Sequence, residues 1–342
     1  MSNTTTSAYL VGDLPAAADL ATPMAIRVAA TIGVADRISE GRRDVGALAQ
    51  VTGTDPGALE LLLNHLVAIG VLLRTECGYA LTELGQGLRS DHPGGLRARF
   101  NLDGSGHSAL GMIELLHTVR TGESAYKRHF GHSFYEKCAA DPEFAHSFHM
   151  LMRGTIESEA RDIAFGYDWG ALTTIADVGG GDGTLLIELL RAHPTLRGTV
   201  IDMGAAVEAA LENIHAAGLE ERADAVEASF FEELPSHFGG CVLSSVLPDW
   251  PDADALRILR NCARAVAPRG KVLVLKPSEK SRTEHWTTAQ ALRLYALQGG
   301  RERSLEELES LVAESGMRLA EVTDIGRRSI VELAAAAGQS TE

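Results

Sequence analysis

Residues 174–186 read TIADVGGGDGTLL, and this stretch decides the fold. An apolar run ends in Asp177, a cluster of glycines follows, and a helix-forming sequence begins at Thr184. Glycines let the backbone turn sharply and let a ligand come close to the peptide groups. The stretch therefore predicts a strand, a tight turn and the start of a helix, with a ligand site at the turn.

The next segment strengthens this prediction. Residues 196–202 read LRGTVID, which is typical of a second strand that ends in an acid. Asp202 follows Gly183 by 202 − 183 = 19 residues. An acid at this distance, at the tip of the second strand, can accept hydrogen bonds from both hydroxyls of a ribose.

Two carboxylates indicate which nucleoside would bind. A dinucleotide needs a seat for its pyrophosphate at a helix N-terminus. Here Asp177 precedes the glycines and Asp182 lies among them, so a pyrophosphate would be repelled. S-adenosylmethionine carries a sulfonium and an ammonium group and no phosphate. We therefore expect S-adenosylmethionine rather than NAD(P).

Composition limits the class of protein. The chain has 342 residues, enough for two domains, and a net charge of −15. This charge argues against non-specific binding to nucleic acids or to anionic membranes. The four cysteines are scattered and have no metal-ligand spacing, so we expect no metal site and reduced thiols in a cytoplasmic protein. We see no signal peptide and no apolar run of transmembrane length.

Residues 13–92 read as helices followed by a small hairpin, which is a winged-helix pattern. The helix predicted at 58–69 would be the DNA-reading helix, yet it contains no Lys or Arg. Such a helix fits poorly in a phosphate-lined groove. A dimerisation and substrate-lid role is therefore favoured over a transcription regulator with a ligand-sensing domain, which remains the alternative from another class.

Residues 94–166 read as mostly helical, and strands and helices alternate from residue 171 onward. We expect strands at 171–178, 198–202, 224–227, 241–246 and 271–276, and helices at 184–192, 204–217 and 252–267. This alternation predicts an α/β fold with a parallel sheet and helices on both faces. Ligands bind at the carboxyl ends of such strands, near which lie Asp177, Asp202, Ser229 and Ser244.

Four motifs carry a resemblance to a known family: DVGGGDG at 177–183, SFF at 229–231, LPDW at 247–250 and GGRERS at 299–304. With them, the chain resembles the two-domain S-adenosylmethionine-dependent O-methyltransferases of small molecules, above all the bacterial ones that tailor aromatic polyketides and other antibiotics. The resemblance runs from about residue 14 to residue 333. It implies a Rossmann-like class I methyltransferase domain and a helical, winged-helix dimerisation domain.

The resemblance also implies domain boundaries and an assembly. Residues 1–93 would form the dimerisation domain, residues 94–166 a helical linker and substrate lid, and residues 167–342 the catalytic domain. The protein would be a homodimer that acts on a small aromatic substrate, with no nucleic-acid or membrane partner.

The same resemblance assigns cofactor-binding residues. Gly179 and Gly181 would line the methionine part of the cofactor beside Asp177, and Asp202 would hold the ribose. Ser229 and Phe230 would flank the adenine as a hydrogen-bond partner and a stacking face. Ser244 would contact the amino-acid end of the cofactor. Arg153 would bind the cofactor carboxylate. The alternative is that Arg153 is a charge on the surface of a helix.

Position 248 departs from the family. The family motif reads Leu-His-Asp-Trp, and its histidine is the base that deprotonates the substrate hydroxyl. Pro248 has no proton-accepting side chain and cannot do this work. Glu302 matches the glutamate that orients the missing histidine, and is either catalytic or a remaining surface charge.

Two outcomes stay open. Methyl transfer can proceed through positioning and the acidity of the substrate itself, or a replacement base can come from His107, His146 or His149. Alternatively, the chain is an enzyme of the same fold that binds the cofactor but performs non-methylating chemistry, such as hydroxylation coupled to decarboxylation.

Overall fold

The structure is a computed structural model that describes residues 14–92, 95–281 and 285–336. The chain divides into two compact units, Met1–Leu110 and Gly111–Glu342. Within the described ranges, no helix is long and apolar enough to cross a membrane. The boundary expected between residues 93 and 94 lies outside the described residues.

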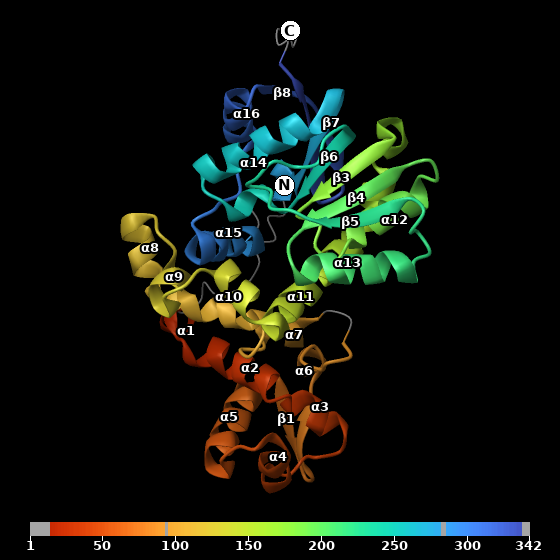
Figure 1. Ribbon diagram of the computed structural model, residues 1–342. Coiled ribbons are helices and arrows are strands. Elements are labelled where there is room, and N and C mark those ends of the chain that lie inside the picture. Colours follow the sequence, from red (N-terminus) through yellow and green to blue (C-terminus); the bar gives the residue numbers. More distant parts are fainter. Residues whose placement is uncertain (1–13, 93–94, 282–284, 337–342) are drawn as a thin grey trace, which may run out of the picture. The chain divides into compact units, whose positions relative to one another are not determined.

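The N-terminal unit consists of short helices and one hairpin (Figure 1). Its helices are α1 (Leu14–Ala18), α2 (Ala21–Thr31), α3 (Val34–Ser39), α4 (Val45–Thr52), α5 (Pro56–Ala68), α6 (Glu83–Gln86) and α7 (Leu96–Phe100). The strands β1 (Leu72–Thr75) and β2 (Gly78–Leu81) pair antiparallel, as the sequence predicts. The 3-10 helix η1 (Ser105–Glu114) runs across the division between the units.

Helix α5 shows why this unit folds as the sequence suggests. Asp55 caps it, because its Oδ1 accepts a hydrogen bond of 2.8 Å from the backbone N–H of Ala58. Leu59, Leu63 and Leu66 follow at helical spacing and are buried in the core of the unit. The helix therefore stabilises the unit through one apolar face.

The second unit begins with helices that precede the sheet. They are α8 (Leu115–Thr121), α9 (Ala125–Phe130), α10 (Phe134–Ala140), α11 (Pro142–Phe165) and the 3-10 helix η2 (Trp169–Leu172). A capping box between Ser133 and Glu136 begins α10. Rings of α9, α10 and α11 pack together in a small core of their own, centred on Tyr126, Phe134 and Phe144.

A seven-stranded sheet of order β5-β4-β3-β6-β7-β9-β8 forms the centre of the second unit. Its strands are β3 (Thr174–Val178), β4 (Arg197–Asp202), β5 (Ala223–Glu227), β6 (Phe238–Ser244), β7 (Val266–Pro277), β8 (Met317–Ile325) and β9 (Arg328–Ala335). The pairs from β5 to β7 are parallel, whereas β9 runs antiparallel to β7 and to β8. The chain order reverses between β3 and β6, which is where ligands bind in such sheets.

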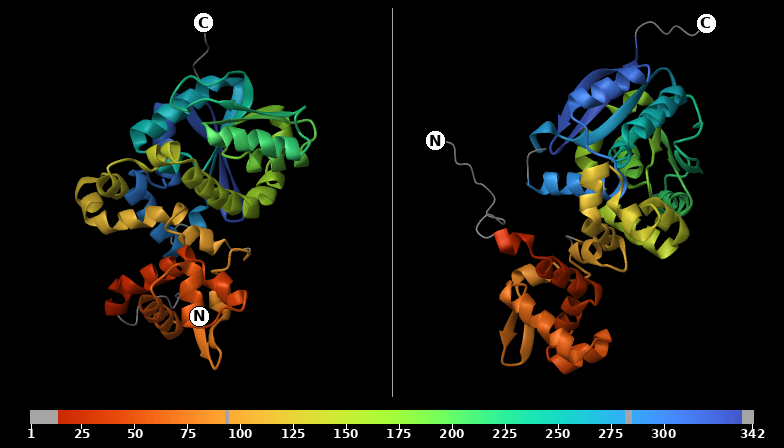
Figure 2. Two further views of the ribbon diagram at one scale, coloured as in Figure 1. Left: turned by 60° about the horizontal axis from the view of Figure 1, so that its bottom comes forward. Right: turned by 90° about the vertical axis from the view of Figure 1, so that its left-hand side faces the viewer.

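Helices cover both faces of this sheet (Figures 1 and 2). They are α11 with α12 (Thr184–Ala192) and α13 (Ala205–Ala216) on one face, and α14 (Asp252–Ala265) and α16 (Leu305–Glu314) on the other. Helix α15 (His285–Gln298) packs against α8 and α9 instead. Neighbouring strand residues point to opposite faces. Thus Ile175 packs in the core that contains α11, α12 and α13, while Ala176 packs in the core that contains α14 and α16.

The structure confirms the predicted α/β class and corrects three details. Residues 171–173 belong to the turn around η2 rather than to the first strand, and β6 ends at Ser244 instead of 246. The sheet is not wholly parallel, because β8 and β9 form an antiparallel hairpin at its edge. A hairpin needs only a short connection, so the chain can return at the edge without another crossover helix.

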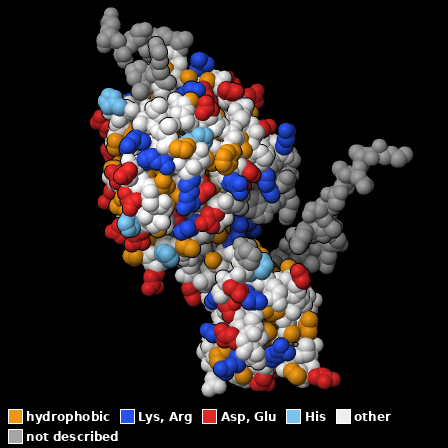
Figure 3. Space-filling model, turned by 90° about the vertical axis from the view of Figure 1, so that its right-hand side faces the viewer, with side chains coloured by type: hydrophobic (Ala, Val, Ile, Leu, Met, Phe, Trp, Pro, Cys, Tyr) orange, Lys and Arg blue, Asp and Glu red, His pale blue; other side chains and the backbone are white. Residues whose placement is uncertain are grey.

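Charged side chains of both signs cover one face of the molecule. On the face of the molecule seen in Figure 3, acidic and basic side chains are intermixed over the unit that holds the sheet. This face shows no basic patch of the kind that binds a nucleic-acid backbone.

Candidate active site

The glycine turn after β3 has the conformation that only glycine adopts easily. Gly179, Gly181 and Gly183 have φ values of 70°, 59° and 77°. Apart from the neighbouring residues in the chain, no atom of the described residues lies within 4 Å of the place where a Cβ on Gly181 would stand, so there is open space beside the turn. A Cβ on Gly179 would come within 2.7 Å of Val246, which joins the turn tightly to the segment after β6.

Asp202 lies at the end of β4, as predicted, and is held by the backbone. Its Oδ2 accepts a hydrogen bond of 2.8 Å from the N–H of Gly181, and its Oδ1 accepts one of 2.8 Å from the N–H of Met203. The side chain is half-buried, and burial raises its pKa. The carboxylate is therefore oriented beside the glycine turn before any ribose is bound.

Asp177 is the buried acid of the site. Asp177 is 1% exposed, and neither of its carboxyl oxygens has a hydrogen-bond partner within the described part of the chain. Burial, and then the charges of Asp202 and Asp182, raise its pKa to about 7. A cationic ligand would relieve this cost and a phosphate would increase it. The carboxylates around the turn thus fit S-adenosylmethionine and do not fit a dinucleotide.

Arg153 lies on α11 next to the glycine turn. Its Nε donates a hydrogen bond of 2.8 Å to Glu157, and its Nη1 is 3.6 Å from Oδ2 of Asp182. The guanidinium is therefore within reach of the turn, in contact with two carboxylates. Its assignment to the cofactor carboxylate stays a prediction.

The predicted adenine side lies after β5. Ser229 accepts a hydrogen bond of 3.2 Å from the N–H of Phe231, which closes a tight turn. The ring of Phe230 is 3.6 Å from where a Cβ on Gly179 would stand, and it packs edge-on against Trp250 at 5.8 Å. Ser244 is half-buried at the end of β6, in the middle of the sheet. These placements agree with the predicted roles but do not test them.

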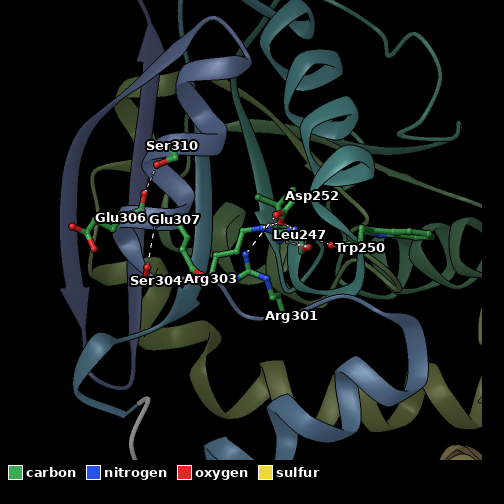
Figure 4. A network of polar contacts seen from close by, with 9 residues as sticks. All are labelled: Leu247, Trp250, Asp252, Arg301, Arg303, Ser304, Glu306, Glu307 and Ser310. Atoms are coloured by element: carbon green, nitrogen blue, oxygen red, sulfur yellow. Dashed lines mark hydrogen bonds and ion pairs between the residues drawn. The ribbon is translucent and has the colours of Figure 1, made fainter. Parts of the chain in front are cut away.

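The LPDW motif forms the 3-10 helix η3 (Leu247–Asp249), in which Pro248 is buried. The side chain of Arg303 points toward this segment and holds it through hydrogen bonds (Figure 4). Its Nη1 and Nη2 each donate a hydrogen bond of 2.8 Å, to the carbonyls of Leu247 and Trp250, and its Nε donates one of 2.9 Å to Asp252. The buried guanidinium thus satisfies two backbone acceptors of an irregular turn.

The GGRERS motif packs closely against the LPDW segment. A Cβ on Gly300 would come within 2.2 Å of the carbonyl of Pro248, so only glycine permits this close approach. Arg301 is more exposed and pairs with Glu307 at 2.6 Å. Ser304 caps α16 in a capping box with Glu307 (Figure 4). These residues of the motif therefore help to fix the position of the LPDW segment. Glu302 is considered next.

Among the predicted catalytic residues, Glu302 and His149 lie near the site. The charge of Glu302 raises the pKa of Asp249. His149 is half-buried on α11, where burial lowers its pKa while the charges of Asp202 and Asp182 oppose this shift. His146 is exposed on the same helix, and His107 belongs to the N-terminal unit. Their catalytic roles stay predictions.

Sequence reasoning missed one pair of residues. The hydroxyl of Tyr135, on α10, donates a hydrogen bond of 2.5 Å to Oδ2 of Asp249, which follows Pro248 in the chain. The ring of Tyr135 also stacks on Trp250, with ring centroids 5.4 Å apart and planes 13° apart. The capping box at Ser133 predicts the start of α10, but no sequence signal links this helix to a residue 114 positions away.

Comparison with known proteins identifies the family. A family model described as an O-methyltransferase domain matches residues 112–318, and one described as an O-methyltransferase dimerisation domain matches residues 16–91. The chain belongs to the O-methyltransferase family. The family match decides for an enzyme and against the transcription regulator considered above.

Two relatives of this O-methyltransferase come from Streptomyces species. It is 45% identical over 324 residues to a 2,7-dihydroxy-5-methyl-1-naphthoate 7-O-methyltransferase of Streptomyces carzinostaticus, covering 94% of this chain and 97% of the relative. It is 38% identical over 309 residues to an aclacinomycin 10-hydroxylase of Streptomyces purpurascens, covering 88% and 83%.

A solved structure has the same fold. It is an O-methyltransferase from neocarzinostatin biosynthesis in complex with S-adenosylmethionine and 2-hydroxy-5-methyl naphthoic acid. The TM-score is 0.92 at 44% identity, with 96% of this chain and 100% of that chain covered.

Proposed function

We propose that this O-methyltransferase transfers the methyl group of S-adenosylmethionine to a phenolic hydroxyl of a bicyclic aromatic acid of the hydroxynaphthoate class, in the biosynthesis of an antibiotic. The cofactor assignment rests on the buried carboxyl group of Asp177, which lies beside a glycine turn and has no hydrogen-bond partner among the described residues. The substrate class rests on the relative that is a naphthoate O-methyltransferase and on the solved complex with a naphthoic acid.

Different residues would bind the nucleoside end and the amino-acid end of the cofactor. Asp202 would accept hydrogen bonds from the ribose, and Ser229 and Phe230 would flank the adenine. Asp177 and Arg153 would face the charged amino-acid end. The bound sulfonium supplies the methyl group: an O–CH3 bond forms, the C–S bond breaks with its electron pair on sulfur, and S-adenosylhomocysteine remains.

Incubation of the protein with S-adenosylmethionine and hydroxynaphthoic acids, followed by mass spectrometry, tests this proposal. We expect one methyl group on the acid for each S-adenosylhomocysteine formed, and a strong loss of both with Asp202→Ala. An absence of methylated product across the hydroxynaphthoates would contradict the substrate class.

The second candidate is non-methylating chemistry on the same fold. The buried Pro248 at the usual base position and the similarity to an aclacinomycin 10-hydroxylase favour it. The same experiment separates the two candidates, because a decarboxylated product would lose carbon dioxide, with a proton taking the place of the carboxylate, while the methyl donor is not consumed.

We further propose a homodimer formed through residues 14–110. The family model of a dimerisation domain supports it. So do large apolar side chains on the surface of this unit, among them Leu14, Leu20 and Leu61, which are 80%, 68% and 74% exposed. Light scattering should give about 73 kDa, twice the chain mass of 36.4 kDa. An active monomer at micromolar concentration would refute the dimer.

A further inference from the structure

We propose that Asp249, held in place by Tyr135, accepts the proton of the substrate hydroxyl in this chain. The inference rests on the proposed methyl transfer and names the base for it. It replaces the expectation that positioning and substrate acidity act alone. Asp249 directly follows Pro248, which stands where the family motif has its histidine.

The backbone and the carboxyl group of Asp249 are held by separate contacts. The N–H of Asp249 donates a hydrogen bond of 3.1 Å to the carbonyl of Val246 within the η3 turn. Arg303 donates hydrogen bonds to the carbonyls of Leu247 and Trp250, the residues that flank Pro248 and Asp249. The hydroxyl of Tyr135 binds Oδ2, which leaves Oδ1 to accept a hydrogen bond from a substrate.

Tyr135 is itself fixed. Its ring stacks on Trp250, so both ends of the side chain are held by the LPDW segment. A rigid donor of this kind keeps the carboxylate in one orientation, which a general base needs. The pair is therefore built from α10 and η3, two elements that are distant in the sequence.

The pair lies beside the residues predicted to hold the cofactor. Trp250 packs edge-on against Phe230, and Phe230 lies next to the glycine turn at Gly179. The charge of Asp202 is close enough to contribute to the raised pKa of Tyr135. Both Tyr135 and Asp249 remain half-buried rather than sealed, so a ligand can reach them.

Burial and two neighbouring side chains give Asp249 the pKa of a base that works at neutral pH. Burial raises it most, the hydrogen bond from Tyr135 lowers it, and the charge of Glu302 raises it, to about 7 in total. Around Tyr135, burial and Asp249 raise the pKa and the Gln298 side chain lowers it, so the phenol stays a donor. Within the described residues, Tyr135 from α10 and Glu302 after α15 are thus the ionisable groups that shift the pKa of Asp249.

The proton balance is simple. Above its pKa, Asp249 accepts the proton of the substrate O–H on Oδ1 and becomes a neutral carboxylic acid, while the substrate oxygen keeps the electron pair and becomes the nucleophile. After the product leaves, the half-exposed carboxyl returns the proton to water. Tyr135 keeps its own proton throughout, and acts as a positioning residue.

A matched control exists in the same unit. The hydroxyl of Tyr167 donates a hydrogen bond of 2.7 Å to Glu332, another tyrosine–carboxylate pair, which also binds Lys271. Because this pair is not part of the proposed site, Tyr167→Phe measures the cost of losing such a bond for structural reasons alone.

The kinetic experiment is a single-turnover pH profile with S-adenosylmethionine and a hydroxynaphthoic acid. The wild type should show an inflection near pH 7, the pKa of Asp249. Asp249→Asn should lose the inflection and about 10²-fold in rate, the usual size of a general-base contribution. Tyr135→Phe should move the inflection to higher pH and Glu302→Gln to lower pH, because these groups shift the pKa of Asp249 in opposite directions. Tyr167→Phe should leave it in place.

A second readout needs no turnover. Infrared difference spectra of the cofactor-free protein should contain a C=O band of a protonated carboxyl that Asp249→Asn removes. Its titration midpoint should lie near pH 7 and move with Tyr135→Phe and Glu302→Gln as above.

The outcomes are distinct. If the wild type methylates its substrate and Asp249→Asn keeps both rate and inflection, Asp249 is not the base and the function stands. A midpoint below about pH 5 in the infrared titration also overturns the inference, since such an acid would be an ordinary carboxylate. If no substrate is methylated, the proposed function fails, and the infrared titration still decides whether Asp249 has the pKa of a base.

Discussion

The backbone N–H of Gly181 donates a hydrogen bond of 2.8 Å to Oδ2 of Asp202, so the turn after β3 and the end of β4 are joined. Each half of this bond comes from a separate strand–helix connection. The acid that would hold the ribose is therefore preorganised by the glycine turn itself.

Asp202→Ala should weaken the binding of S-adenosylhomocysteine by about 1.5–3 kcal/mol, since charged hydrogen bonds to the ribose are lost. Titration calorimetry measures this directly. Asp224→Ala is the matched control, because Asp224 is an exposed acid on the neighbouring strand β5. Equal affinities of wild type and Asp202→Ala would remove Asp202 from the cofactor site.

Asp177→Asn should stabilise the cofactor-free protein at high pH and weaken cofactor binding. The folded pKa of Asp177 is raised to about 7, above the unfolded value of about 3.9, so its contribution to stability falls as pH rises from about 4 to 7 and then levels off. Three pKa units correspond to at most roughly 4 kcal/mol. Urea unfolding should therefore show the variant more stable at pH 8 and similar to wild type near pH 4. A constant difference at both pH values would contradict the raised pKa.

Arg303→Lys should destabilise the protein by about 2–4 kcal/mol. Lysine lacks the planar fork that binds two carbonyls and a carboxylate at once, and at least one buried acceptor would lose its partner. Arg301→Lys is the control, because Arg301 is a more exposed residue of the same motif that also pairs with Asp252. It should cost less than about 1 kcal/mol. Denaturant unfolding measures both variants. If they lose the same free energy of unfolding, the three hydrogen bonds of Arg303 do not stabilise the LPDW segment as described.

Pro248→His should raise the methylation rate of weakly acidic hydroxyls. It restores the base of the family motif beside Glu302, and position 248 at the start of η3 needs no backbone donor within that turn. The rate of the variant should gain an inflection near the histidine pKa of about 6.5. An unchanged rate, with circular dichroism showing an intact fold, would mean that the base position is not open to the substrate.

The sequence by itself determined the five parallel strands and the glycine turn, because both depend on local chemistry. Strand–turn–helix patterns are short-range, and the glycines at 179, 181 and 183 are needed for positive φ wherever they occur. The place of Asp202 follows from the same pattern, since parallel strands end at one edge of a sheet. The antiparallel β8–β9 edge was not predicted, because edge strands depend on which neighbour the chain meets.

The partners of the LPDW segment were decided only by the tertiary structure. Pro248 marks a missing base in the sequence, but the Tyr135–Asp249 bond joins residues 114 positions apart, through packing of α10 against η3. The same holds for Arg303, whose motif position says nothing about the carbonyls that it binds. Such long-range contacts also set the pKa of Asp249 and Asp177, because burial and neighbouring charges exist only after folding.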